Sequence, residues 1–359
     1  MKVVYVGSYN TNDIMTGPEK VSRRVFEEYS KTDETIFIHY FQDGRKYSYF
    51  KKLFGYEETD SVNGSKVLKL GVFRMIYTLF RLQPELIHVL CFNRFVIFLY
   101  LLKIFTRVKM YYTMNGIIRH ENKYYNKESV FTVLKNIVVE NVLIYFSEKV
   151  FYLSEFSKSI LRIYYNPDNS KLIKAINGLD ACFINQDSSA LSEKELNSVV
   201  FIGNIDQKEK GFDFLLQTLL MCERKIKLYI IDSSDKVSRF PGFPNIEINF
   251  VDKMLPEQMV NFLKNKSIIA APGEYDTFNI SVLEAASCGL YPVLTNQTGV
   301  SEIIGDYFPA SVFDCKDKVL LMKALERILG EPSKYCVYKE LDRLSWNNAV
   351  KNYYVRHYE

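Results

Sequence analysis

Short apolar runs and amphipathic stretches alternate along the whole chain. The first half holds five runs whose length and apolar content predict strands: Val3–Gly7, Thr35–Tyr40, Leu86–Leu90, Lys109–Thr113 and Lys149–Leu153. Longer stretches between them, such as Glu19–Ser30 and Glu128–Tyr145, are expected to be helices. Strands that alternate with helices predict a parallel sheet with helices on both faces.

The same alternation starts again after Asn185–Asn197, a polar stretch that we interpret as the connection between two sheets. Further strands are predicted at Ser198–Ile202, Lys227–Ile231, Ile246–Val251, Ser267–Ala270 and Tyr291–Thr295, with helices at Phe212–Met221 and Pro256–Lys264. The predicted fold class is therefore α/β. Two Rossmann-like doubly wound domains, residues 1–180 and 181–342, are expected to face a cleft.

The composition agrees with two globular domains. Of the 359 residues, 48% are hydrophobic and 25% are charged, which excludes a disordered chain. The six cysteines have no metal-finger or redox spacing, so reduced thiols in a cytosolic core are expected. The opening strand is too short for a signal peptide, and no apolar run is long enough to span a bilayer. We therefore expect a cytoplasmic protein.

Charge is distributed unevenly along the chain. Residues 1–180 carry 26 Lys and Arg against 18 Asp and Glu, a net charge of +8, whereas residues 181–359 carry a net charge of −4. Basic and aromatic residues mix in Phe73–Arg81 and Phe92–Lys109. This mixture fits equally a surface that rests on the inner face of an anionic membrane and ordinary amphipathic helices with solvated charges. No nucleic-acid-binding motif is present, so no nucleic acid partner is expected.

Two glycine-containing turns in the first half follow predicted strands. Gly17 precedes a helix, where a ligand could approach bare backbone N–H groups, although such a glycine is more often a simple turn. Asn115 and Gly116 follow the strand Lys109–Thr113 and would face the expected cleft, and here too a plain turn is the commoner explanation.

A stronger candidate follows the strand Ser198–Ile202. Gly203 and Asn204 end this strand, and Lys208 and Lys210 come before the next helix. A glycine turn with lysines suits a diphosphate, because the lysines supply positive charge to a leaving group that becomes more negative. We prefer this interpretation to a pair of solvated lysines.

The segment Ala271–Gly289 carries the most specific pattern. A loop with Asp276 follows a buried strand, and Glu284 lies among small apolar residues of the next helix. A carboxylate in such surroundings is costly unless it is bound, and ribose hydroxyls could donate to it. The N–H groups at the start of the helix could bind phosphate, while Asp276 could bind sugar hydroxyls. The alternative is that Glu284 caps a neighbouring backbone.

On these residues the chain resembles the retaining, GT-B-fold glycosyltransferases of family 4. The family signature joins two acidic residues eight positions apart, as Asp276 and Glu284 are, and Gly299 and Glu302 fit its downstream loop. Further landmarks occur in the family's order at Gly17, Ser154-Glu155, Asn177–Asp180 and Lys210-Gly211. The resemblance covers nearly the whole chain, but only the segment with the acidic pair is specific.

The resemblance implies a hexosyltransferase that moves a sugar from a nucleotide-diphosphate sugar to a glycan or lipid-linked acceptor, in surface polysaccharide biosynthesis. Glu284 would hold the ribose, Lys210 the diphosphate and Asp276 the transferred sugar. The final segment, residues 343–359, is expected to pack back on the first domain. The expected donor site comprises Gly17, Gly203, Asn204, Lys208, Lys210, Asp276, Thr277, Phe278, Asn279, Ile280 and Glu284, with Asn115 and Gly116 on the acceptor side.

The chain departs from the family pattern at three positions. Asp276 replaces the usual Glu, Asn204 the usual Arg, and Asn115 the usual His. A non-catalytic partner subunit of the same fold therefore stays open as an alternative. A nucleotide-sugar epimerase, which can also use two such domains, is a second alternative, although the chain offers few histidines for its acid–base chemistry. No Asp-x-Asp motif is present, so we expect neither a metal ion nor another cofactor, with lysines and helix ends meeting the phosphate charge.

Overall fold

The computed structural model describes residues 2–10, 14–41, 47–124, 129–184, 194–231, 240, 242–308, 310–314, 317–335 and 341–358. The chain forms two compact units. The first comprises residues 1–153, 157–177 and 346–359, and the second comprises residues 154–156 and 178–345. Most of the predicted connection Asn185–Asn197 lies outside the described residues, as do Cys315 and Cys336. Cys91, Cys182, Cys222 and Cys288 form no disulfide.

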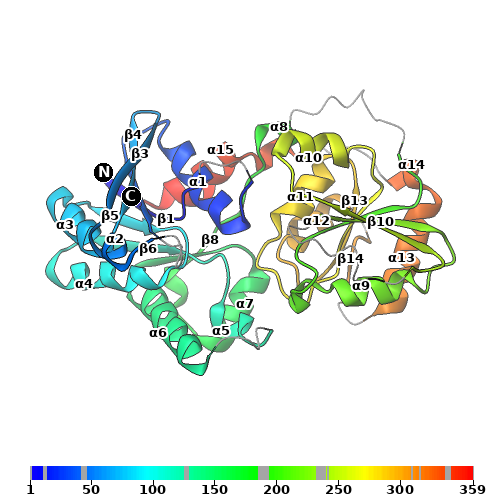
Figure 1. The fold of residues 1–359 in the computed structure, drawn as a ribbon, viewed down its shortest axis with the longest axis horizontal. Helices are drawn as coiled ribbons and strands as arrows, with labels where there is room; N and C mark the ends of the chain where they lie inside the picture. Colours follow the sequence, from blue (N-terminus) through cyan, green and yellow to red (C-terminus); the bar gives the residue numbers. More distant parts are fainter. Residues whose placement is uncertain are drawn as a thin grey trace. The chain divides into compact units, whose positions relative to one another are not determined.

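The first unit is built on an eight-stranded sheet (Figure 1). In chain order its strands are β1 (Val3–Gly7), β2 (Ile36–Tyr40), β3 (Tyr56–Val62), β4 (Ser65–Leu70), β5 (Leu86–Val89), β6 (Lys109–Thr113), β7 (Lys149–Tyr152) and β8 (Leu172–Lys174). They are arranged in the order β3-β4-β2-β1-β5-β6-β7-β8, and every neighbouring pair except β3–β4 is parallel. The five predicted strands are all present.

The β3–β4 hairpin and β8 are additions that the apolar pattern did not predict. The hairpin turns at Asn63 and Gly64, whose φ angles of 51° and 81° fit the two left-handed positions of a type I′ turn. Strand β3 is polar and lies at the edge of the sheet, so its sequence lacks the apolar run of a buried strand. Edge strands of this kind are therefore poorly predicted from apolar runs.

Helices and short helical turns connect these strands. They are α1 (Gly17–Tyr29), α2 (Tyr49–Phe54), α3 (Val72–Leu82), α4 (Ile97–Phe105), α5 (Ile118–Glu121), α6 (Val130–Phe146), α7 (Glu155–Tyr164) and α15 (Trp346–Ala349), with short turns η1 (Arg94–Val96), η2 (Asn169–Lys171), η7 (Val350–Tyr354) and η8 (Val355–His357). Helix α1 contacts α15 and η7, whereas α2, α3, α4 and α6 contact one another in a row. Figure 1 shows α1 and α15 together, away from α3, α4 and α6.

The C-terminal segment is part of the core of the first unit. Tyr358 Oη accepts a 3.0 Å hydrogen bond from Tyr5 Oη and lies 2.7 Å from His88 Nδ1, while His88 Nε2 lies 2.9 Å from Thr113 Oγ1. Burial lowers the pKa of His88 to about 3, so this imidazole is neutral at pH 7. Residues 346–359 thus join a unit whose other residues lie more than 150 positions earlier.

The second unit has a six-stranded, entirely parallel sheet. Its strands are β9 (Ser198–Ile202), β10 (Ile226–Ile231), β11 (Ile246–Val251), β12 (Ile268–Ala271), β13 (Tyr291–Thr295) and β14 (Val312–Phe313). Their order, β11-β10-β9-β12-β13-β14, is the 3-2-1-4-5-6 order of dinucleotide-binding Rossmann sheets when counting starts at β9. The order reverses between β9 and β12, and ligands bind at such a switch point.

The helices of the second unit are α8 (Ala181–Ile184), α9 (Phe212–Leu219), α10 (Pro256–Leu263), α11 (Ile280–Ser287), α12 (Ser301–Tyr307), α13 (Lys318–Gly330) and α14 (Pro332–Tyr335), with η4 (Lys208–Lys210) and η6 (Asp342–Leu344). The predicted α/β fold class with two doubly wound sheets is confirmed. In the described part of the chain, none of the helices combines the length and the apolar content needed to cross a bilayer.

Candidate functional site

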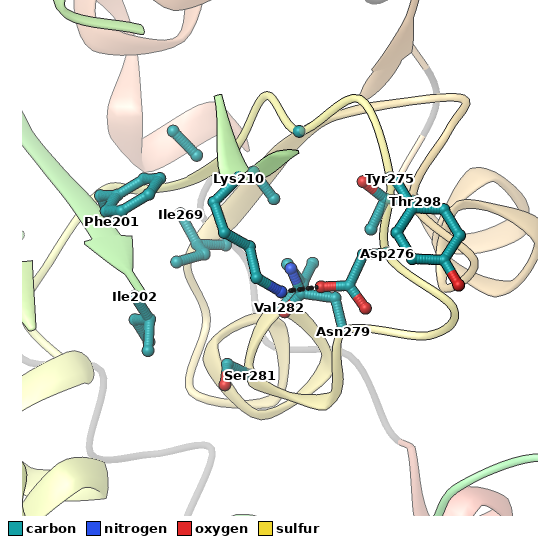
Figure 2. A pocket seen from close by; sticks show the side chains of 13 residues that line it. Phe201, Ile202, Lys210, Ile269, Tyr275, Asp276, Asn279, Ser281, Val282 and Thr298 are labelled. Carbon is teal, nitrogen blue, oxygen red and sulfur yellow. Dashed lines mark hydrogen bonds and ion pairs between the residues drawn. The ribbon is translucent and has the colours of Figure 1, made fainter. Parts of the chain in front are cut away.

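A pocket lies where the strand order of the second unit reverses (Figure 2). Strand β9 contributes Phe201 and Ile202, and β12 contributes Ile269, Ala270 and Ala271. The segment after β9 contributes Lys210, and the segment after β12 contributes Gly273, Tyr275, Asp276 and Asn279. The start of α11 contributes Ser281 and Val282, and the loop after β13 contributes Thr298. The strands are apolar because the sheet is covered on both sides, so the polar chemistry of this site comes from the loops.

An ion pair between Lys210 and Asp276 spans this pocket. Lys210 Nζ lies 2.6 Å from Asp276 Oδ2, and the exposed fractions of the two side chains are 29% and 13%. The other carboxylate oxygen, Oδ1, accepts a 3.2 Å hydrogen bond from the N–H of Phe278. The orientation of Asp276 is thus fixed through both oxygens.

Two glycines allow the loops that carry Lys210 and Asp276 to lie against each other. Gly211 follows Lys210 with φ of 73°, and a Cβ atom there would lie 2.3 Å from the carbonyl oxygen of Pro272. A Cβ atom on Gly273 would lie 2.8 Å from the carbonyl oxygen of Glu209, which accepts a 2.8 Å hydrogen bond from Glu274 N–H. Larger residues would push the loops apart and separate the ion pair.

A third loop, after β13, fixes the backbone on both sides of Asp276. The N–H of Asp276 donates to the carbonyl of Gln297 at 3.1 Å, and its carbonyl accepts from the N–H of Gly299 at 2.9 Å. A Cβ atom on Gly299 would lie 2.1 Å from the carbonyl oxygen of Thr277, so only glycine allows this approach. The loop after β13 therefore fixes the backbone of Asp276 through two hydrogen bonds.

The remaining candidates after β9 lie outside the pocket. The Oδ1 atom of Asn204 accepts a 2.9 Å hydrogen bond from the N–H of Asp206, so this side chain stabilises its own turn. Lys208 is exposed and lines a neighbouring hollow with Gly211, Phe212 and Glu274. Gly203 lies at the end of β9 with φ of 149°, and a Cβ atom there would lie 3.8 Å from the Phe201 ring and 3.9 Å from Lys210 Cγ. Of the two lysines predicted to bind the diphosphate, only Lys210 lines this pocket, where it pairs with Asp276.

Helix α11 begins at the pocket and carries Glu284 away from it. Asn279, in the left-handed region with φ of 65°, precedes the helix and makes no side-chain cap to its N–H groups. Ser281 and Val282 line the pocket, whereas Thr277, Phe278 and Glu284 are buried and do not. The N–H of Cys288 donates to the carbonyl of Glu284 at 3.3 Å, and burial and then the Glu284 charge raise the pKa of the Cys288 thiol to about 12.

The other predicted site residues belong to the first unit. Gly17 is the first residue of α1, and no atom lies within 4 Å of where its Cβ would be. Asn115 donates a 2.7 Å hydrogen bond through Nδ2 to the carbonyl of Leu90. A Cβ atom on Gly116 would lie 2.2 Å from Glu121 Oε1, so Gly116 allows a close contact with that carboxylate. These contacts give Asn115 and Gly116 local structural roles.

Most residues that line the pocket were not predicted from the sequence, and those with polar side chains are Tyr275, Ser281 and Thr298. Tyr275 and Ser281 flank predicted residues and could have been found by position alone. Thr298 could not, because it reaches the pocket through the pairing of its loop with Asp276. Within the described ranges, no three His, Cys, Asp or Glu side chains gather closely enough to hold a metal ion.

Comparison with known proteins supports a single family for the second unit. Residues 184–345 match the family model described as glycosyl transferases group 1. This match includes Lys210, Asp276 and Glu284. A search of curated protein sequences finds no match.

Solved structures share the fold of the whole chain at low sequence identity. Sucrose-phosphate synthase from Thermosynechococcus elongatus is 13% identical with a TM-score of 0.72, over 98% of this chain and 92% of that one. HepE from Anabaena, solved in complex with UDP-glucose, is 13% identical with a TM-score of 0.67, over 98% and 93%. WaaG, a glycosyltransferase involved in lipopolysaccharide biosynthesis, is 13% identical with a TM-score of 0.64, over 97% and 94%. The predicted GT-B fold is thereby confirmed.

Proposed function

We propose that this chain, whose residues 184–345 form a glycosyl transferases group 1 domain, transfers a hexose-type sugar with retention of configuration. The donor would be a nucleotide-diphosphate sugar, and the acceptor a glycan or a lipid-linked glycan. The observation that carries this proposal is the Lys210–Asp276 ion pair at the switch point of a Rossmann sheet.

The two charged groups match two adjacent parts of such a donor. In a nucleotide-diphosphate sugar the diphosphate is bonded directly to the sugar, so the groups that bind them should also be neighbours. Lys210 would bring its positive charge to the diphosphate next to the Asp276 carboxylate. The Asp276 carboxylate can accept hydrogen bonds from sugar hydroxyls.

Lys210 would contribute most as the glycosidic bond breaks. The leaving diphosphate then gains negative charge, and a lysine already in place stabilises that charge without rearrangement. The N–H groups at the start of α11 are not capped by Asn279 and would add to the same effect. The acceptor attacks on the face that the diphosphate leaves, and the departing phosphate takes up the acceptor's proton, so no side-chain base and no metal ion are assigned.

Glu284 is proposed to bind the ribose of the donor. It lies on α11, beyond the residues that line the pocket, as expected for a group that binds a more distant part of the nucleotide. Gly203, Asn204 and Lys208 would lie near the donor after β9 and make weaker contacts than Lys210. Asn115, Gly116 and Gly17 are proposed to serve the acceptor and donor from the first unit.

Relatives support the donor class and the biological setting of this proposal. HepE was solved with UDP-glucose, and WaaG is involved in lipopolysaccharide biosynthesis. We therefore propose a cytoplasmic enzyme of surface polysaccharide biosynthesis that uses a uridine or similar nucleotide sugar. The shorter Asp276 in place of the family's usual Glu is expected to shift the position of the sugar and so influence which hexose is accepted.

The proposal is tested with a panel of nucleotide sugars. Thermal shift should identify the donor that stabilises the protein, and that donor should release nucleoside diphosphate when acceptor glycan is added. Conversion of the donor into an epimer without release would indicate an epimerase. Binding without either reaction, across the panel and with several acceptors, would indicate a non-catalytic subunit.

A further inference from the structure

Exposed aromatic side chains are concentrated in one part of the first unit. Among the described residues, every exposed aromatic side chain lies between Tyr49 and Phe146. These residues belong to α2, α3, α4 and α6 or directly adjoin them, and the four helices contact one another in sequence. In the described part of the second unit, by contrast, the exposed large hydrophobic side chains are Leu, Met and Val. A water-soluble protein rarely exposes so large an apolar surface unless the surface binds something.

The exposed side chains follow the helical repeat, so they form stripes on single helix faces. In α3, Phe73, Tyr77 and Phe80 are spaced by four and three residues and are 52%, 52% and 55% exposed. Arg74 and Arg81, seven residues apart, flank this stripe, and both guanidinium groups lie within 6 Å of the Tyr77 ring centre. An aromatic stripe flanked by arginines is the pattern of helices that lie in a membrane interface.

Helix α6 repeats this arrangement. Phe131, Leu134, Val138 and Tyr145 lie on one face and are between 47% and 67% exposed, although the helix is apolar along most of its length. A helix with so few polar residues is normally covered by other parts of the protein. Lys135 stands beside the stripe, with Nζ 4.1 Å from the centre of the Phe131 ring.

The charge on these helices is almost entirely positive. Helices α2, α3, α4 and α6 contain six Lys or Arg residues and one acidic residue, Glu140. Glu140 is fully buried, and its carboxylate accepts hydrogen bonds from the N–H groups of Ile118 and Arg119, so it adds no negative charge to the surface. Lys51 and Lys103 form 2.6 Å ion pairs with Glu57 and Glu148, which lie just outside these helices. The positive charge of the face therefore comes chiefly from Arg74, Arg81 and Lys135, which lie beside its exposed aromatic side chains.

We propose that this face, formed by α2, α3, α4 and α6, docks on an anionic lipid bilayer. The aromatic side chains enter the interface, while Arg74, Arg81 and Lys135 contact acidic headgroups. A second copy of the chain fits less well, because a symmetric contact would place the same basic residues of two subunits opposite one another. The proposal goes beyond sugar transfer, and it places the first unit at the surface where a lipid-linked acceptor would be held.

Flotation of the full-length protein with vesicles tests the proposal. The protein should float with vesicles of phosphatidylcholine mixed with phosphatidylglycerol, and much less with phosphatidylcholine alone. The double variant Arg74→Gln/Arg81→Gln should reduce partitioning roughly tenfold or more and weaken its dependence on salt. The double variant Phe73→Ser/Phe80→Ser should also reduce partitioning but keep the salt dependence, because it removes only the apolar part of the binding.

Matched controls separate docking from folding and from catalysis. Leu220→Ser/Met221→Ser removes two exposed apolar side chains of the second unit, 40% and 47% exposed, and should float like the parent. Asp276→Asn should also float like the parent even though it lowers transfer, so a failed transfer assay does not affect this test. Parent protein that does not float with anionic vesicles would overturn the proposal. So would a dimer in sedimentation velocity that Phe73→Ser/Phe80→Ser dissociates, since the face would then belong to a second copy.

Discussion

The hydroxyl of Ser154 donates a 2.9 Å hydrogen bond to the carbonyl oxygen of Thr277, the residue that follows Asp276. Ser154 is fully buried and belongs to residues 154–156, a short segment that packs with the second unit. Next to it, the N–H of Phe156 donates to Glu302 Oε1 at 3.0 Å, and the Phe156 ring packs on that of Tyr275. This segment therefore holds both neighbours of Asp276 in place.

Ser154→Ala should lower kcat about tenfold with a smaller effect on the donor KM. The substitution leaves the Thr277 carbonyl without this donor and loosens the loop, and small displacements of a reacting group are costly in rate. Ser157→Ala is the control, because Ser157 is equally buried one turn further along α7. Equal losses of kcat in both variants would show a general loss of stability instead of a positioning role.

Lys210→Ala should weaken donor affinity and turnover, each by about tenfold to a hundredfold. Charge-assisted hydrogen bonds contribute roughly 1.5–3 kcal/mol, and this lysine would bind the diphosphate both before and during bond breaking. Steady-state kinetics with Lys208→Ala as the comparison provides the measurement. Lys208 is exposed and outside the pocket, so its loss should have a much smaller effect. If the two variants behaved alike, the phosphate would be shared or the assignment of Lys210 would be wrong.

Glu284→Gln should leave the fold intact and reduce nucleotide binding roughly tenfold to a hundredfold. Gln keeps the shape of the side chain but replaces the ionised acceptor of the ribose hydroxyls with a neutral one. Isothermal titration with the nucleoside diphosphate and with the isolated sugar separates the possible effects, since only nucleotide binding should change. Nucleotide affinity equal to that of the parent would contradict a ribose-binding role.

Chelation of divalent cations should leave the transfer rate within about twofold of its original value, since Lys210 and the start of α11 would supply the positive charge. The measurement is nucleoside diphosphate release before and after EDTA, followed by addition of Mn²⁺ or Mg²⁺. A complete loss of activity that either ion restores would show that a metal ion bridges the diphosphate.

The stability of the first unit should fall as the pH is lowered from about 6.5 toward 3, partly through His88. Burial lowers the pKa of His88 to about 3, so between these pH values the unfolded chain binds a proton that the folded chain does not. The stabilising effect is fully present above the unfolded pKa and is lost as the pH falls. Each such proton changes the free energy of unfolding by about 1.4 kcal/mol per pH unit.

His88→Gln therefore should flatten this pH dependence by about one proton, which calorimetry at several pH values can measure. His357→Gln is the comparison, because the pKa of His357 is lowered by its partial burial and by Arg356 and Lys149. His357 is much less buried than His88, so its replacement should flatten the profile less. An unchanged slope for His88→Gln would mean that His88 is already neutral in the unfolded state or protonated in the folded one.

Local periodicity in the sequence determined the two sheets and their main helices. Runs such as Val3–Gly7 and Ser198–Ile202 form strands as predicted, because a strand buried on both faces must be apolar throughout. Lys210 and Asp276, which the sequence singled out, both line the pocket at the switch point, while the roles assigned to them and to Glu284 stay predictions. These features were readable because each one depends on residues close together in the chain.

Tertiary structure alone decided which of these residues meet. Lys210 and Asp276 are 66 positions apart, and Ser154 and Thr277 are 123 apart, so no local pattern indicates either contact. The first contact requires that β9 and β12 be neighbours and that Gly211 and Gly273 let their loops touch. Glu284, eight residues from Asp276 in sequence, instead lies outside the pocket because the helix that follows Asn279 carries it away. The order of the strands and the close approach of the two loops bring Lys210 and Asp276 together. Neither feature can be predicted from residues that are close together in the sequence.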